Sequence, residues 1–151
     1  MNKQDVLEML GRTRKRLLHV LEKCDDGMLD FKPEMKLPKG GSFHKARNIL
    51  RHIAGAKSYW IRCKVLREKD CPKYDFSNKS LREIIEVLQD VRKYTLCWLD
   101  RIGDDELTKP YTQKAKTSTS MILYHLVEHE AHHLGQICMI GDIAGIDIPW
   151  V

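Results

Sequence analysis

Apolar residues recur at spacings of three and four in four long segments of this chain, including Val6, Leu10, Leu17 and Leu21 near its start. That spacing is typical of a helix that buries one stripe of its surface. No segment shows the two-residue alternation of a half-buried strand. We therefore predict an all-α protein, and four helices of roughly 20 to 27 residues favour a four-helix bundle.

Local signals place the ends of these helices. The expected helices run from about 2 to 24, 42 to 68, 80 to 102 and 118 to 144. Ser80 and Glu83 fit a capping box, in which two side chains satisfy free amides of the first turn. Gly103 and Gly145 follow the last two helices, where glycine favours helix termination. The long connections 25–42 and 104–117 are the segments in which we expect any crossover of the bundle.

Length and composition indicate one globular domain. A chain of 151 residues, 42% hydrophobic and 31% charged, can bury one core, so residues 1–151 are expected to form a single domain. No apolar run approaches the ~20 residues of a membrane span, and the first residues lack the apolar stretch of a signal peptide. We expect a cytoplasmic protein without a membrane partner.

The basic residues do not form a recognisable nucleic-acid interface. The net charge is +5, and the densest cluster comprises Arg12, Arg14, Lys15 and Arg16. This cluster carries no interleaved aromatic residues and no nucleic-acid module, so we interpret it as a solvated helix face. No nucleic-acid partner is expected.

The cysteines predict neither a disulfide framework nor a thiolate metal site. Their number is odd, they are widely spread, and none forms a C-x-x-C pair; they are Cys24, Cys63, Cys71, Cys97 and Cys138. Such a pattern suggests neither a disulfide framework nor a zinc site built from thiolates. We expect free thiols that mostly fill the core.

Histidines concentrate in the last helix, where four of the seven lie between residues 125 and 133. At ~100° per residue, His129 and His133 project onto the apolar face, with His125 and His132 at its edge. Two imidazoles one turn apart can bind one metal ion. Burying them without partners would cost roughly 1–3 kcal/mol for each unsatisfied nitrogen. The pattern therefore favours a metal site, buried between helices, over a structural cluster.

A third ligand is expected from another helix. His52 is the best candidate, because it lies on the inner side of the second helix, between Ile49 and Ala56. His19 and His44 are weaker candidates, beside the basic cluster and at a loop edge respectively. Imidazole ligands suit a divalent metal ion. We expect zinc or nickel, with iron as an alternative.

Residues 129–133 also match H-E-x-x-H, the pattern in which two histidines bind zinc and a glutamate acts as general base. Only 18 residues follow His133, and no strand is expected that would hold a peptide, so a protease is disfavoured. Glu130 projects into the apolar sector. It either orients a metal-binding imidazole or forms a buried salt bridge with an arginine. Gln136 is a second candidate for orienting an imidazole.

Two stretches, ILRHIAGAKSYW at 49–60 and HLVEHEAHHLGQI at 125–137, resemble the DinB/YfiT-like family of metalloenzymes. The resemblance implies a four-helix bundle with a metal held by His52, His129 and His133. This sequence departs from the family pattern at Leu134, where an arginine is common, and at Lys57, where an acidic residue is often seen. These departures concern substrate contacts more than the metal.

Three neutral imidazoles leave the charge of a divalent ion uncompensated, so the ion should be a Lewis acid with an open position. The family resemblance implies a transferase that joins a low-molecular-weight thiol, such as bacillithiol or mycothiol, to small electrophiles. One alternative is a small-molecule hydrolase that uses metal-activated water, with Glu130 or another carboxylate as base. Another is a non-enzymatic, stress-related metal-binding protein. We expect a homodimer, the commonest assembly of soluble proteins.

Overall fold

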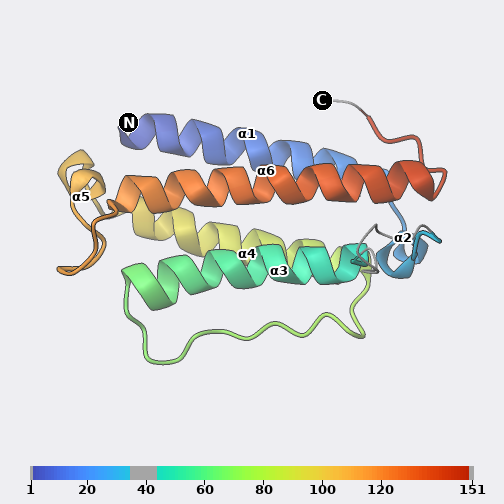
Figure 1. Cartoon of the computed structure of the whole chain (residues 1–151), viewed down its shortest axis with the longest axis horizontal. Coiled ribbons are helices and arrows are strands. Elements are labelled where there is room, and N and C mark those ends of the chain that lie inside the picture. Colours follow the sequence, from blue (N-terminus) through green and yellow to red (C-terminus); the bar gives the residue numbers. More distant parts are fainter. Residues whose placement is uncertain (1, 35–43, 150–151) are drawn as a thin grey trace.

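The protein is a bundle of four long helices. The computed structural model describes residues 2–34 and 44–149, which contain helices and no strand. The long helices are α1 (Lys3–Leu21), α3 (Ala46–Ser58) with its π-helical continuation η1 (Tyr59–Val65), α4 (Leu81–Asp100) and α6 (Thr119–Ile143) (Figure 1). Two short helices, α2 (Asp26–Asp30) and α5 (Asp104–Thr108), lie in connections where we expected none. The predicted all-α fold is confirmed.

The crossover of the bundle is not where we expected it. Figure 1 shows that α1 and α6 run in one direction and that α3 and α4 run in the other. Because α3 and α4 are parallel, the chain must return to the starting end of α3 before α4 can begin. Residues 66–80 make this return along the length of the bundle (Figure 1). The connections 25–42 and 104–117 each join two long helices that run in opposite directions, and their described parts carry α2 and α5 near opposite ends of the bundle.

Caps account for the ends of the helices. The predicted capping box of α4 is present, since Ser80 Oγ accepts from the Glu83 amide at 3.2 Å and the Glu83 carboxylate accepts from the Ser80 amide at 2.7 Å. Asn2 and Asp5 form a second capping box on α1, which we did not predict. Gly145 ends α6 with a φ of 80°, a conformation that favours glycine. The expected helix start near Ser42 lies outside the described residues.

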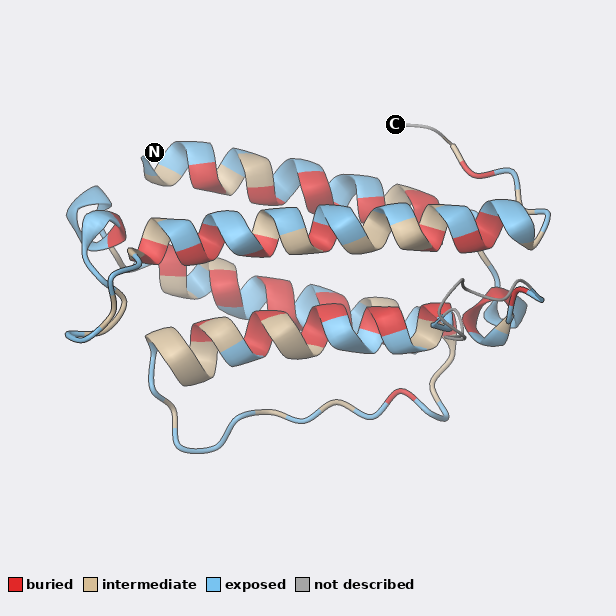
Figure 2. Cartoon of the chain, in the orientation of Figure 1, coloured by how far each residue is buried: buried red, intermediate tan, exposed pale blue. Residues whose placement is uncertain are grey.

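The core follows the predicted apolar stripes. In Figure 2 the buried residues of each long helix face the other helices, whereas the exposed residues face outward. The expected positions Leu10, Leu88 and Ile137 are all fully or nearly fully buried. Helix α6 contacts both α1 and α3, so its apolar stripe is covered from two sides. No helix in residues 2–34 and 44–149 is long and apolar enough to cross a bilayer.

The interior also contains charged side chains, and one of them corrects our interpretation of the basic cluster as a solvated face. Arg12, Lys15 and Arg16 are exposed as expected, but Arg14 is not. Arg14 is only 5% exposed, because it follows Leu10 by four residues and precedes Leu17 by three on the buried stripe of α1. Its guanidinium pairs with both carboxylate oxygens of Glu130 on α6, each at 2.8 Å. Lys57 of α3 donates to the same carboxylate at 2.6 Å.

Arg92 of α4 completes this buried charge cluster of Arg14, Lys57, Arg92 and Glu130. Burial and the nearby charge of Arg14 lower the pKa of Arg92 to about 10. Its Nη1 atom is buried without a hydrogen-bond partner among the described residues. Each long helix therefore contributes one residue to the cluster, in which three cationic side chains surround one carboxylate.

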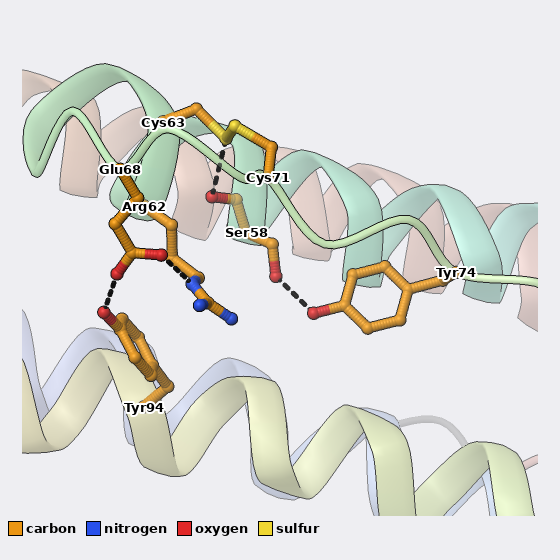
Figure 3. The surroundings of a disulfide bond; sticks show 7 residues. All are labelled: Ser58, Arg62, Cys63, Glu68, Cys71, Tyr74 and Tyr94. Atoms are coloured by element: carbon orange, nitrogen blue, oxygen red, sulfur yellow. Dashed lines mark hydrogen bonds and ion pairs between the residues drawn. A yellow bond between two sulfur atoms is a disulfide. The ribbon is translucent and has the colours of Figure 1, made fainter.

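A disulfide contradicts the expectation that all five cysteines are free. Cys63 in η1 and Cys71 in the return connection are bonded, with their Cα atoms 5.8 Å apart (Figure 3). The chain turns back after η1, and this turn brings the two residues together, whereas their spacing in the sequence gave no such signal. Cys24 and Cys138 are free and half-buried against the core, while Cys97 is free and exposed. Cys97 is therefore not the core filler that we expected.

Other contacts fasten the same connection to the bundle. Tyr74 hydrogen-bonds to Ser58 at 2.6 Å, and Glu68 accepts from both Arg62 and Tyr94 of α4 (Figure 3). The disulfide closes a short loop and so restricts mainly the unfolded chain.

We expect Cys71→Ser to lower the free energy of unfolding by about 2–3 kcal/mol, the loop-closure entropy of a disulfide of this span. Urea unfolding of the oxidised protein measures this change, and Cys97→Ser, which removes a free thiol, is the matched control. Equal stability of Cys71→Ser and the parent protein would contradict the prediction.

Candidate metal centre

Three histidines from two helices point their Nε2 atoms at one place. His129 Nε2 lies 2.9 Å from His52 Nε2 and 3.2 Å from His133 Nε2. One nitrogen from each ring lies within 4.8 Å of the others, close enough to share an ion. His129 and His133 are one turn apart on α6, and α3, which carries His52, packs beside that helix. The structure thus brings together the three residues that the sequence singled out, which we call the histidine triad.

We expected the triad to lie deep inside the bundle. It lies instead at the edge of the bundle. His52 is exposed, and His129 and His133 are half-buried. The deepest positions between α3 and α6 are occupied by apolar side chains such as Ile53 and Leu126. The histidines border this apolar stripe, so the triad is open to small molecules from outside.

The surroundings of His129 and His133 favour the neutral form of both rings. Burial and the neighbouring imidazoles lower the pKa of His129 to about 4. Burial also lowers the pKa of His133, although a hydrogen bond to Gln136 partly opposes this shift. Neutral imidazole is the form that binds a metal, because its unprotonated nitrogen carries a free lone pair.

Gln136 determines which nitrogen of His133 is free. The side-chain oxygen of Gln136 lies 2.6 Å from His133 Nδ1, so Nδ1 carries the proton and donates it. The Nε2 lone pair of the neutral ring then faces the triad. This is the way in which a hydrogen bond to one ring nitrogen prepares the other for a metal.

The converging nitrogens fit a cation better than they fit one another. His129 Nε2 has two nitrogen neighbours within hydrogen-bond distance, but a single N–H can donate well to only one of them. A divalent ion among the three rings would accept all three lone pairs at once, with metal–nitrogen bonds of ~2.0–2.1 Å. The donor set therefore suits a borderline metal such as zinc or nickel.

Glu130 is bound elsewhere. Burial acts to raise its pKa, but the hydrogen bonds and charges of Arg14 and Lys57 outweigh this effect and lower the pKa to about 2. Its two oxygens are thus used by the buried charge cluster. The sequence left two roles open for Glu130, and the structure shows the buried salt bridge. A carboxylate engaged in this way is a poor general base, which further disfavours a protease.

The remaining histidines surround the triad or lie away from it. His125 and His132 are exposed on α6, as their projected positions indicated, and their ring centroids lie 5.9 and 5.1 Å from those of His129 and His133 respectively. His44 lines the pocket beside the triad. His19 lies on α1 and approaches Glu22 at 4.0 Å.

A pocket of about 410 Å³ opens beside the triad. Two members of the triad line it, together with Ile49 and with polar residues of α3, of the segment before α3 and of α6. The lining residues are His44, Asn48, Ile49, Arg51, His52, His133 and Gln136. We call it the polar pocket. Asn48 and Arg51 could not be recognised in the sequence, because polar residues at a helix surface give no signal until the neighbouring helix is placed.

Aromatic rings lie on the other flank of the triad. Trp60 packs edge-to-face against His125 and Tyr111, with ring centroids 5.7 and 6.4 Å apart. His125 in turn adjoins His129. The triad thus lies between the polar pocket and an aromatic flank of Trp60, Tyr111 and His125.

Lowering the pH from 7 to 5 should destabilise the metal-free protein. The pKa of His129 is about 4 in the folded protein and 6.5 in the unfolded chain, so the unfolded chain binds more protons in this interval. The contribution of neutral His129 to the stability of the fold is therefore lost as the pH falls from 6.5 towards 4. Urea unfolding at both pH values measures the change, and His129→Gln should reduce it. An identical decrease in the variant would contradict this assignment.

Comparisons with known proteins identify the family and the fold. The model of the DinB family matches residues 1–151. A crystal structure of an uncharacterised protein from Escherichia coli UTI89 has a TM-score of 0.76 at 17% identity, over 97% of this chain and 96% of that one.

A DinB-like protein from Bacillus cereus ATCC 10987 has a TM-score of 0.72 at 18% identity, over 100% of this chain and 99% of that one. At such identities the structures show a shared fold and no shared activity. No curated protein is similar enough to be matched. Because the family model covers the whole chain, the protein belongs to the DinB family.

Proposed function

We propose that the protein is a metal-dependent transferase that joins a low-molecular-weight thiol to small electrophiles. The observation that carries this proposal is the convergence of three imidazoles at the open edge of the bundle, beside a pocket of about 410 Å³. A volume of this size is typical of a small-molecule site. The DinB family resemblance of the sequence points to a thiol as the cosubstrate.

The chain would supply binding and orientation. His52, His129 and His133 would hold a divalent ion, and Gln136 would keep the His133 ring turned towards it. When bound, such an ion supplies Lewis acidity that lowers the pKa of a thiol or a water molecule. In the overall reaction the thiol sulfur bonds to the electrophilic carbon, the leaving group departs with its electron pair, and the thiol proton passes to solvent.

The two flanks of the triad suit two different ligands. Trp60 and Tyr111 offer apolar ring surface to an organic electrophile. The polar pocket offers hydrogen-bonding groups from Asn48 and Arg51 to the thiol. Both sites adjoin the triad, so the two reactants would be held near each other.

Thiol conjugation before and after metal removal tests the proposal. Chlorodinitrobenzene serves as the electrophile, because release of chloride and formation of the coloured thioether both follow from one C–S bond. We expect conjugation with small thiols to exceed the uncatalysed rate only in the metal-loaded protein, and this excess to return when zinc or nickel is added back after chelation. His133→Ala should abolish it, whereas His19→Ala on α1 should retain it.

Conjugation that survives chelation would overturn the proposal. Turnover of esters or amides by the loaded protein without any thiol would favour the hydrolase instead. Metal binding with neither reaction would favour the non-enzymatic alternative.

Gln136→Leu should weaken metal binding about 10- to 100-fold, the usual effect of removing a hydrogen bond that orients a histidine ligand. The substitution removes the acceptor for His133 Nδ1, so the proton can move to Nε2 and block the lone pair. Competition with a chromophoric chelator measures the affinity. Gln89→Leu, at an exposed position of α4, is the control. Unchanged affinity in Gln136→Leu would contradict the role assigned to this residue.

A further inference from the structure

We infer that Arg51 binds an anionic group, a carboxylate in the simplest case, on the thiol that enters the polar pocket. This inference rests on the proposed function and adds to it the charge of the cosubstrate and the residue that selects it. Its basis is the juxtaposition, in a single pocket, of two members of the histidine triad and an arginine that forms no ion pair with the described residues.

The position of Arg51 places it within reach of a ligand at the triad. Arg51 directly precedes His52 on α3, and both line the polar pocket together with His133. Asn48 precedes His52 by one helical turn and lines the same pocket. A small molecule with its sulfur near the triad can therefore extend its other end towards Arg51 and Asn48.

Arg51 differs from Arg47, which lies one turn earlier on the same helix. Arg47 is fixed by the Asp30 carboxylate at 2.7 Å and by the carbonyl oxygens of Phe76 and Lys79 at 2.6 and 2.5 Å. These bonds fasten α3 to α2 and to the return connection, so Arg47 has a structural role. No ion pair within 4.0 Å engages Arg51 in the described part of the chain.

Asp75 is the acidic residue whose charge interacts with Arg51, and the two line a neighbouring pocket together, but no ion pair within 4.0 Å joins them. Hydrogen bonds from Ser77 are the main cause of the lowered pKa of Asp75, and the charge of Arg51 adds to them. Asp75 thus lies within electrostatic range of Arg51, but it accepts its hydrogen bonds from the Ser77 amide and hydroxyl at 2.9 and 2.6 Å. It lies outside the residues that line the polar pocket.

The charge balance of the pocket favours an anion. None of the described residues that line it is acidic, whereas Arg51 carries a full positive charge. The three imidazoles of the triad are uncharged when they act as ligands, so a divalent ion there would add its full charge nearby. Two positive centres in one concave site attract an anionic ligand and disfavour a cationic one. The planar guanidinium is also well matched to a carboxylate, with which it forms two parallel hydrogen bonds.

Titration of the cobalt-substituted protein with three small thiols tests this inference. Mercaptopropionate, mercaptoethanol and mercaptoethylamine offer an anionic, a neutral and a cationic end at similar size. Sulfur binding to Co²⁺ produces a near-ultraviolet charge-transfer band, so affinity is read without turnover. We expect mercaptopropionate to bind about tenfold more tightly than mercaptoethanol, once the different thiol pKa values are accounted for, and mercaptoethylamine to bind most weakly.

Variants separate Arg51 from the general charge of the protein. The Arg51→Ala protein should lose the preference for mercaptopropionate but still bind one equivalent of cobalt. The Arg51→Glu protein should prefer mercaptoethylamine. Arg82→Ala, which removes an exposed arginine on α4, should leave the preference unchanged. An unchanged preference in Arg51→Ala would overturn the inference, as would equal binding of the three thiols by the parent protein.

Different results would contradict the inference about charge and the proposed function. If the loaded protein binds all three thiols equally, the inference about charge fails and the proposed thiol site stands. If cobalt binds but no thiol changes its spectrum, the proposed function itself fails, and the inference fails with it.

Discussion

Replacing Glu130 by glutamine is expected to lower the free energy of unfolding by about 3–5 kcal/mol, the usual cost of removing one partner from a buried ion pair. The carboxylate is 2% exposed, and in the described part of the chain it is the acidic group that faces Arg14, Lys57 and Arg92 in the buried charge cluster. Glutamine keeps the shape but leaves these cations uncompensated. The decrease would be a large fraction of the total stability of an ordinary domain.

Urea unfolding at pH 7 measures this effect. At that pH the contribution of Glu130 is fully present, because its folded pKa of about 2 lies below the value of 4.5 in the unfolded chain, and it is lost only as the pH falls from 4.5 towards 2. Glu128→Gln, at an exposed position of the same helix, should change stability by less than about 0.5 kcal/mol. A change below about 1 kcal/mol in Glu130→Gln would contradict the role of the cluster.

The cluster also predicts how a second substitution behaves. Burial is the main reason that the pKa of Lys57 falls to about 8, and Glu130 opposes this fall. Without Glu130 the buried lysine becomes a net cost to the folded state. Lys57→Met should therefore destabilise Glu130→Gln less than it destabilises the parent protein, and a double-mutant cycle measures that coupling.

Loss of one triad histidine is expected to weaken metal binding by at least about 100-fold, more than the loss of a group that only orients a ligand. His52→Ala, His129→Ala and His133→Ala should each show this effect, because each ring offers one nitrogen to the shared position. The decrease in metal affinity caused by His52→Ala is the most informative, since His52 is the member of the triad that lies on α3.

Neighbouring histidines provide the matched controls. His125→Ala and His132→Ala remove exposed rings of α6 that lie beside the triad and outside the three-nitrogen cluster. Their metal affinity should stay within about threefold of the parent value, which corresponds to less than 1.4 kcal/mol. An equal loss in these variants, measured by chelator competition, would show that the ion binds to the histidine-rich surface of α6 without His52.

Much of the fold could be predicted because local signals coincide with the observed helices. The apolar stripe of α4 and its capping residues Ser80 and Glu83 lie close together in the chain, so a short segment contains the information. The triad could be proposed for a similar reason, since His129 and His133 share one face of α6. The choice of His52 required a guess about a second helix, supported by the family resemblance.

The features that were missed depend on contacts between distant segments. Arg14 was assigned to the solvent because its buried partner, Glu130, is 116 residues away. The bond between Cys63 and Cys71 requires the turn after η1, and the crossover of residues 66–80 follows from the direction of α4. A helical projection gives the angle of a residue around its own helix but not its depth, so it placed the triad too far inside.

Anomalous X-ray scattering from crystals of protein purified without chelator determines whether the histidine triad holds a metal ion. Data on either side of the zinc, nickel and iron absorption edges identify the element. We expect one strong anomalous peak within ~2.0–2.1 Å of the Nε2 atoms of His52, His129 and His133. A crystal soaked in these metals that shows no peak there, or shows one bound without His52, would contradict the account.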